Sequence, residues 1–193
     1  MAVTFEQVKA ALDPEEPAYD KAAAALGAEA LPHLARLVAG DQMMLASKAA
    51  YLAGLIGTSA AVDVVQRAAR STHASVRVAA AAAAGKLSSA DAGDVLINLI
   101  DDGDLGVQKV ALRAIPAGAA SDALRARVQS LSAAKGKVSN QDLAIETMAR
   151  IGGLSDTTDA APSPKSPKKA VKKAARKTVK KAAKKTVRRP KPG

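Results

Sequence analysis

The sequence lacks cysteine and tryptophan, and it holds one phenylalanine and two tyrosines among its 193 residues. Without cysteine, the chain has no disulfide framework, no thiolate nucleophile and no cysteine metal site. Enzymes that act on a nucleobase usually stack that base against aromatic or apolar walls. With only Phe5, Tyr19 and Tyr51 as aromatic residues, the sequence disfavours such catalysis. Because Tyr51 falls within an alanine-rich segment, we expect it in the core.

Long apolar segments are also missing. Apolar runs such as residues 78–85 are far shorter than the roughly 20 residues that a helix needs to span a bilayer. The first 16 residues show no basic region followed by an apolar stretch, so no secretory signal is expected. The composition therefore predicts a soluble, cytoplasmic protein without membrane insertion.

Residues with catalytic or metal-binding chemistry are few and isolated. His33 and His73 have no second histidine or cysteine at metal-ligand spacing. The acidic turn at 101–104 lacks the closing glutamate of a calcium loop, and Asp104 is instead predicted to cap the next helix. The sequence thus predicts no catalytic residue, no metal and no cofactor, and it favours a non-enzymatic protein.

Basic residues are concentrated at one end of the chain. The formal net charge is +11 at pH 7, from 29 Lys and Arg against 18 Asp and Glu. Residues 162–193 hold 14 of these cations and no acid, which leaves 15 cations against 18 acids, a net charge of −3, in residues 1–161. This asymmetry is typical of a globular domain that carries a polyanion-binding extension.

A 31-residue register runs through residues 18–151. In this register Val76 corresponds to Leu45 and Val107, and Gly85 corresponds to Gly54. A fixed period of this size is typical of proteins built from stacked helix pairs. The first helices of the pairs are predicted at 18–26, 43–55, 74–87 and 106–115, with an unpaired one at 141–151. The second helices are predicted at 30–38, 60–70, 91–100 and 122–131, after an initial helix at 4–12.

The pattern of a short turn, Val-Arg, Ala-x-x-Ala, Gly and a Leu/Val-rich second helix resembles HEAT repeats. The best match is Val76-Arg77 with Ala80 and Leu87. The resemblance covers about residues 18–151 and implies an all-α, right-handed α-solenoid of about four helix pairs. HEAT repeats commonly carry an Asp in the turn and an Arg just inside the helix. Here only Asp104 and Arg77 fit those positions, so a complete Asp–Arg ladder is not predicted.

Two columns of polar residues keep the 31-residue register on the second helices. Equivalent positions of a solenoid align along one face, so these residues are predicted to form a continuous polar strip. The strip is either an ordinary solvated face or a partner-binding surface on the concave side. The seven residues of this polar strip are Arg36, Arg67, Asn98 and Gln129 in one column and Asp63, Asp94 and Arg125 in the other.

A polar, proline-containing linker at 154–164 separates a helical repeat domain at 1–153 from a basic tail at 165–193. The Lys- and Ala-rich tail resembles the C-terminal tails of linker histones and of bacterial lysine-rich nucleoid proteins. Its like charges repel and it has no core to bury, so it is expected to be disordered in isolation. It lacks aromatic residues for base stacking, so binding to nucleic acid is predicted to run through phosphates without sequence specificity. The predicted nucleic-acid-binding residues are Lys165, Lys168, Lys169, Lys172, Lys173, Arg176, Lys177, Lys180, Lys181, Lys184, Lys185, Arg188, Arg189 and Lys191.

These features favour a non-enzymatic, DNA-associated scaffold or adaptor, whose tail binds nucleic acid and whose solenoid binds a protein partner. Its location would be the nucleoid, or the nucleus if the source is eukaryotic. The alternative is an enzyme or enzyme accessory that the tail concentrates on its substrate, because some HEAT-like proteins resemble alkylpurine DNA glycosylases and others bilin lyases. For the tail alone, a membrane surface, an address signal and a partner-binding arm are further alternatives.

Overall fold

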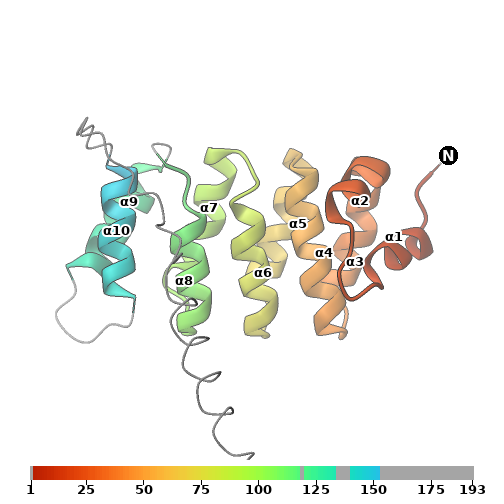
Figure 1. Ribbon diagram of the computed structural model, residues 1–193, viewed down its shortest axis with the longest axis horizontal. Coiled ribbons are helices and arrows are strands. Elements are labelled where there is room, and N and C mark those ends of the chain that lie inside the picture. The colour runs from red at the N-terminus through yellow and green to blue at the C-terminus, as the bar shows by residue number, and fades with distance from the viewer. Residues whose placement is uncertain (1, 118–119, 134–139, 153–193) are drawn as a thin grey trace, which may run out of the picture. The chain divides into compact units, whose positions relative to one another are not determined.

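A computed structural model describes residues 2–117, 120–133 and 140–152, and all of these belong to one unit, Met1–Ser155. The described residues form helices and no strands (Figure 1). After α1 (Phe5–Leu12), the chain alternates between two sets of helices. The first set, here called the A layer, comprises α2 (Tyr19–Leu26), α4 (Met43–Ile56), α6 (Ala74–Ala84), α8 (Leu105–Ala114) and α10 (Gln141–Ile151). The second set, the B layer, comprises α3 (Leu31–Val38, after the 3-10 helix η1, Gly27–Ala30), α5 (Ser59–Ala69), α7 (Ser89–Leu99) and α9 (Asp122–Ser132).

Each helix packs against its counterpart in the next repeat. In the A layer, α4 lies between α2 and α6, and α8 lies between α6 and α10. In the B layer, α5 lies between α3 and α7, and α7 also contacts α9. The helix pairs follow one another in chain order (Figure 1). This arrangement is an α-solenoid, which confirms the fold class predicted from the 31-residue register.

Side-chain caps fix where several helices begin. The Thr4 hydroxyl accepts a hydrogen bond from the Gln7 amide, and the Gln7 side chain accepts one from the Thr4 amide, so α1 starts with a complete capping box. Asp104 Oδ1 accepts hydrogen bonds from the amides of Gly106 at 2.8 Å and Val107 at 3.1 Å. The predicted capping role of Asp104 is therefore confirmed.

Two expectations about the A layer were wrong. The helix predicted at 74–87 ends at Ala84, because the amides of Lys86 and Leu87 form tight-turn hydrogen bonds to the carbonyls of Ala83 and Ala84. Tyr51 is not a core residue. It is half-buried and packs edge-on against Tyr19, with 5.0 Å between the ring centroids.

The A layer is packed closely enough to require glycine at one helix crossing. At Gly54 of α4, a Cβ atom would lie 2.7 Å from the Cα, Cβ and carbonyl oxygen of Ala83 in α6. One repeat later, a Cβ at Gly85 would lie 3.3 Å from the Cβ of Ala114 in α8. The glycine that recurs in the 31-residue register thus lies close to the next A-layer helix at both positions. Large fully buried side chains come from both layers: Leu52, Leu112 and Ile151 from the A layer, and Leu34, Leu96 and Leu99 from the B layer.

Candidate interaction surface

The polar strip lies entirely on the B layer. Its residues stand on the four helices of that layer, each of which contacts the next. Six of its residues are exposed and the seventh, Arg125, is half-buried. Arg36 stands on α3, Asp63 and Arg67 on α5, Asp94 and Asn98 on α7, and Arg125 and Gln129 on α9.

The central residues of the strip, on α5 and α7, are exposed. Within the described part of the chain, the side chains of Asp63, Arg67, Asp94 and Asn98 make no hydrogen bond and no ion pair. Arg67 is cationic, Asp63 and Asp94 are anionic and Asn98 is a neutral amide, so these side chains include both hydrogen-bond donors and acceptors. A depression of about 320 Å³ lies between α5 and α7, and it is lined by Gln66, Ala69, Arg70, Asp94, Val95 and Asn98.

The two ends of the strip differ from its centre. At the α3 end, the Arg36 guanidinium lies over the Phe5 ring, 4.4 Å from the centroid, in a cation–π contact. At the α9 end, Arg125 Nε is buried, and it has no hydrogen-bond partner among the described residues. The neighbouring Arg127 pairs outside the strip with Asp101, at 2.6 Å between Nε and Oδ2. Among the described residues, Gln129 on α9 makes no side-chain hydrogen bond either, so of the seven residues only Arg36 makes a polar or ring contact through its side chain, the one with Phe5.

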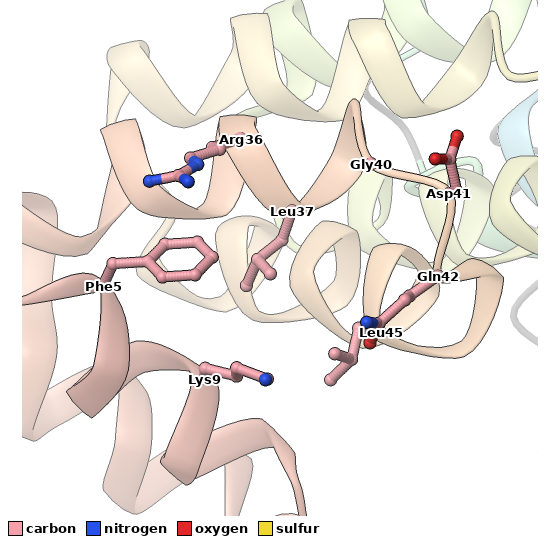
Figure 2. Close-up of a pocket in the computed structure, with 8 residues that line it drawn as sticks. All are labelled: Phe5, Lys9, Arg36, Leu37, Gly40, Asp41, Gln42 and Leu45. Atoms are coloured by element: carbon pink, nitrogen blue, oxygen red, sulfur yellow. The ribbon is translucent and has the colours of Figure 1, made fainter.

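Arg36 also lines a second depression, here called the N-terminal pocket, with a volume of about 310 Å³ (Figure 2). Leu37 points into the space between Phe5 and Leu45, and Arg36 and Lys9 stand on either side of it (Figure 2). Sequence reasoning missed this pocket. The complete lining is Phe5, Lys9, Arg36, Leu37, Gly40, Asp41, Gln42 and Leu45.

A network of polar side chains connects the turns that precede α6 and α8. Arg77 in α6 donates to both carboxylate oxygens of Asp102, from Nε at 2.6 Å and from Nη2 at 2.9 Å. Its Nη1 donates to the carbonyls of Ser71 and Thr72 in the turn that precedes α6. The hydrogen bonds from Arg77 hold the pKa of Asp102 below its usual value, and the same contact raises the pKa of Arg77.

The network continues into the next repeats with amides in place of charges. Gln108 Nε2 donates to the Asp102 carbonyl at 2.6 Å. Asn140 Nδ2 in turn donates to Gln108 Oε1 at 3.1 Å and to the Leu105 carbonyl at 3.0 Å. The sequence predicted no complete Asp–Arg ladder, and the structure forms a mixed one instead. Its acid is Asp102, two residues before the register position that Asp104 occupies.

Among the described residues, neither histidine belongs to a cluster of metal-ligating side chains. His33 Nε2 lies 2.9 Å from the Val3 carbonyl oxygen, and His73 directly precedes the first residue of α6. No group of three or more metal-ligating side chains occurs in residues 2–117, 120–133 and 140–152. The predicted nucleic-acid-binding residues, Lys165 to Lys191, lie outside the described residues. None of the helices in the described ranges is both long and apolar enough to cross a membrane.

Comparisons with known proteins agree with this architecture. Residues 31–116, which run from α3 to the end of α8, match the family model of HEAT repeats. The class of fold is therefore a HEAT-like α-solenoid. Among solved structures, the chain is similar to a chain in the complex of CpcE and CpcF of phycocyanin lyase from Nostoc sp. PCC7120. The two share 20% sequence identity with a TM-score of 0.57, and the match covers 74% of this chain and 96% of that one. No curated protein matches the sequence.

Proposed function

We propose that this protein is a non-enzymatic scaffold whose solenoid binds a protein partner and whose basic tail binds DNA. The observation that carries the first part is the polar strip on α3, α5, α7 and α9, whose central residues have no partner among the described ones. Charged side chains held on stacked helices keep their spacing, so they can match a complementary pattern on another protein. The HEAT repeats at 31–116 support this role, because solenoids of this kind bind partners along extended surfaces.

The proposed role of the tail rests on the charge of the sequence. Fourteen cations and no acid in residues 162–193 stand against a net charge of −3 in residues 1–161. Each phosphate that the tail neutralises releases counterions from the duplex, and this release drives binding without regard to sequence. The tail would hold the protein on DNA, in the nucleoid or in a eukaryotic nucleus, while the solenoid remains free for its partner.

The solenoid half is tested by photocrosslinking of the full-length protein in cells that produce it. A photoreactive amino acid replaces Arg67 or Asn98 on the strip, or Lys109 as an exposed control in α8 of the A layer. We expect discrete protein adducts from positions 67 and 98 and none from position 109. The same adducts from all three positions, or no adduct from the strip positions, would contradict a partner-binding strip.

The tail half is tested by gel retardation of a DNA duplex. The wild-type chain is compared with a full-length variant in which all 14 Lys and Arg of residues 162–193 are replaced by Gln. We expect the wild type to retard the duplex at low salt and the variant to leave it free. Retardation at the same concentration by both proteins would place DNA binding elsewhere in the chain.

A lyase-type accessory role is the second candidate, because the chain of the phycocyanin lyase complex covers most of this solenoid. In that case the strip would bind a second subunit rather than a DNA-associated partner. The measurement is incubation of the protein with a bilin and a phycocyanin subunit, followed by absorbance of the bilin that remains attached after denaturation. Attached bilin above the level without the protein would favour the accessory role over the scaffold.

A further inference from the structure

We propose that the N-terminal pocket anchors the protein partner through a segment that presents one bulky apolar side chain beside an acidic residue. This inference rests on the proposed function, since Arg36 belongs both to the pocket and to the polar strip. A segment that follows the strip along the B layer would end with its apolar side chain in the pocket.

The pocket has the size and lining of an anchor site. Its volume of about 310 Å³ lies at the lower end of the range for ligand sites, which suits one large side chain better than a whole cofactor. The side chains of Phe5, Leu37 and Leu45 supply apolar walls, and Leu37 points between the other two (Figure 2). Buried apolar anchors in such pockets carry much of the binding energy of protein interfaces.

The charges at the pocket favour an acidic partner. Lys9 and Arg36 stand on opposite sides, whereas the Asp41 carboxylate points away from the other labelled side chains (Figure 2). Among the described residues, neither Lys9 nor Arg36 makes an ion pair or a side-chain hydrogen bond, and Arg36 lies over the Phe5 ring. A carboxylate next to the anchor side chain would therefore meet two available cations. The protein's own basic tail has the wrong charge for this place.

The pocket is formed before any partner arrives, because the segment that carries Phe5 is fastened to α3 and the preceding η1. The Val3 amide donates to Glu29 Oε2 at 3.1 Å, and the Val3 carbonyl oxygen lies 2.9 Å from His33 Nε2. The Phe5 ring packs edge-on against the His33 ring, with 6.1 Å between centroids. A preformed site saves the cost of ordering its walls on binding.

Exposed apolar side chains continue the surface beside the pocket. Met43 is 46% exposed and Met44 is 70% exposed at the start of α4, between the lining residues Gln42 and Leu45. Methionine side chains are flexible and adapt readily to a partner's shape. The two methionines would contact the residues that flank the anchor.

The test uses the full-length protein and a synthetic fluorescent peptide of twelve residues with a central phenylalanine flanked by aspartates. Binding is followed by fluorescence anisotropy. We expect saturable binding to the wild type, and at least a tenfold weaker affinity both for a peptide with alanine in place of the phenylalanine and for the double variant Lys9→Glu, Arg36→Glu. The matched control is Lys86→Glu, an exposed cation beyond the end of α6, which should leave the affinity unchanged.

A charge swap separates recognition from misfolding. The double variant should bind a peptide with lysines in place of the aspartates at least tenfold more tightly than the wild type does. No binding of the acidic peptide to the wild type, or equal affinity for both peptides in both proteins, would overturn the pocket as an acidic-segment anchor. If the double variant still gives the crosslinks from positions 67 and 98, the pocket is not the anchor, but the partner-binding strip stands. If the wild type gives no crosslinks from these positions, the proposed function itself is wrong.

Discussion

Replacement of Gly54 by alanine probes the close contact between α4 and α6. The added Cβ would lie 2.7 Å from three atoms of Ala83, of which two belong to the backbone of α6. No rotamer change can relieve this clash, so α4 and α6 must move apart. Overpacking of a tight interior costs about 1–3 kcal/mol, and alanine recovers up to about 1 kcal/mol of helix propensity. We expect the variant to lose about 1–2 kcal/mol of unfolding free energy.

The matched control is Gly93→Ala in the middle of α7. There the added Cβ would lie 3.7 Å from the Ser121 hydroxyl, an ordinary contact, so the propensity gain of about 0.5–1 kcal/mol should appear alone. Urea unfolding followed by circular dichroism gives the unfolding free energy of both variants. In a thermal melt, the melting temperature of a chain of this size should shift by about 2–4 °C per kcal/mol. A Gly54→Ala variant as stable as Gly93→Ala would refute the close approach of α4 and α6.

Three further predictions concern the ion pair of Arg77 with Asp102 and the exposed ion pair of Arg127 with Asp101. Arg77→Met keeps the aliphatic stem but removes the hydrogen bonds to Asp102, Ser71 and Thr72, and it should lower the unfolding free energy by about 1.5–3 kcal/mol in urea titrations. Arg127→Met removes an exposed pair with Asp101 and should leave the melting temperature unchanged; an equal loss in both variants would contradict the distinction between them. Because the pKa of Asp102 is lowered in the folded state, its stabilising effect is present above the unfolded pKa of about 3.9 and is lost as pH falls through the folded value. The stability difference between the wild type and Asp102→Asn should therefore be constant near neutral pH and shrink below about pH 4, and a difference that grows in acid would reverse that sign.

The helices of the solenoid could be predicted because their signals are local. The 31-residue register and the capping residues Thr4 and Asp104 fixed the order of the helices and most of their bounds. The end of α6 was placed three residues too late, since Leu87 continues the apolar stripe even though the backbone has already turned after Ala84. An apolar stripe reports which side chains are buried, and a turn can bury one as well as a helix can.

The sites depended on contacts between distant segments, which the sequence does not reveal. Asp102 was missed as the partner of Arg77, because the 31-residue register places Asp104, not Asp102, at the turn position of HEAT repeats. The Asp104 carboxylate instead caps α8. The N-terminal pocket lies between α1, α3 and the start of α4, and the segment before α1 is held to α3 by the contact of Val3 with His33. One signal was available: the chain's only phenylalanine, Phe5, precedes the repeats. The strip itself was predictable as an alignment of polar residues, whereas the contact of Arg36 with Phe5 was not.

The salt dependence of DNA binding tests the central proposal most directly. Affinity of the full-length protein for a duplex is measured between 50 and 200 mM salt, beside the variant with all 14 tail cations replaced by Gln. If the tail neutralises about 6–10 phosphates, the wild-type affinity should fall about 10³–10⁵-fold across this range, and the variant should bind weakly with little salt dependence. Equal affinities and equal slopes for the two proteins would contradict the tail as the tether of this scaffold.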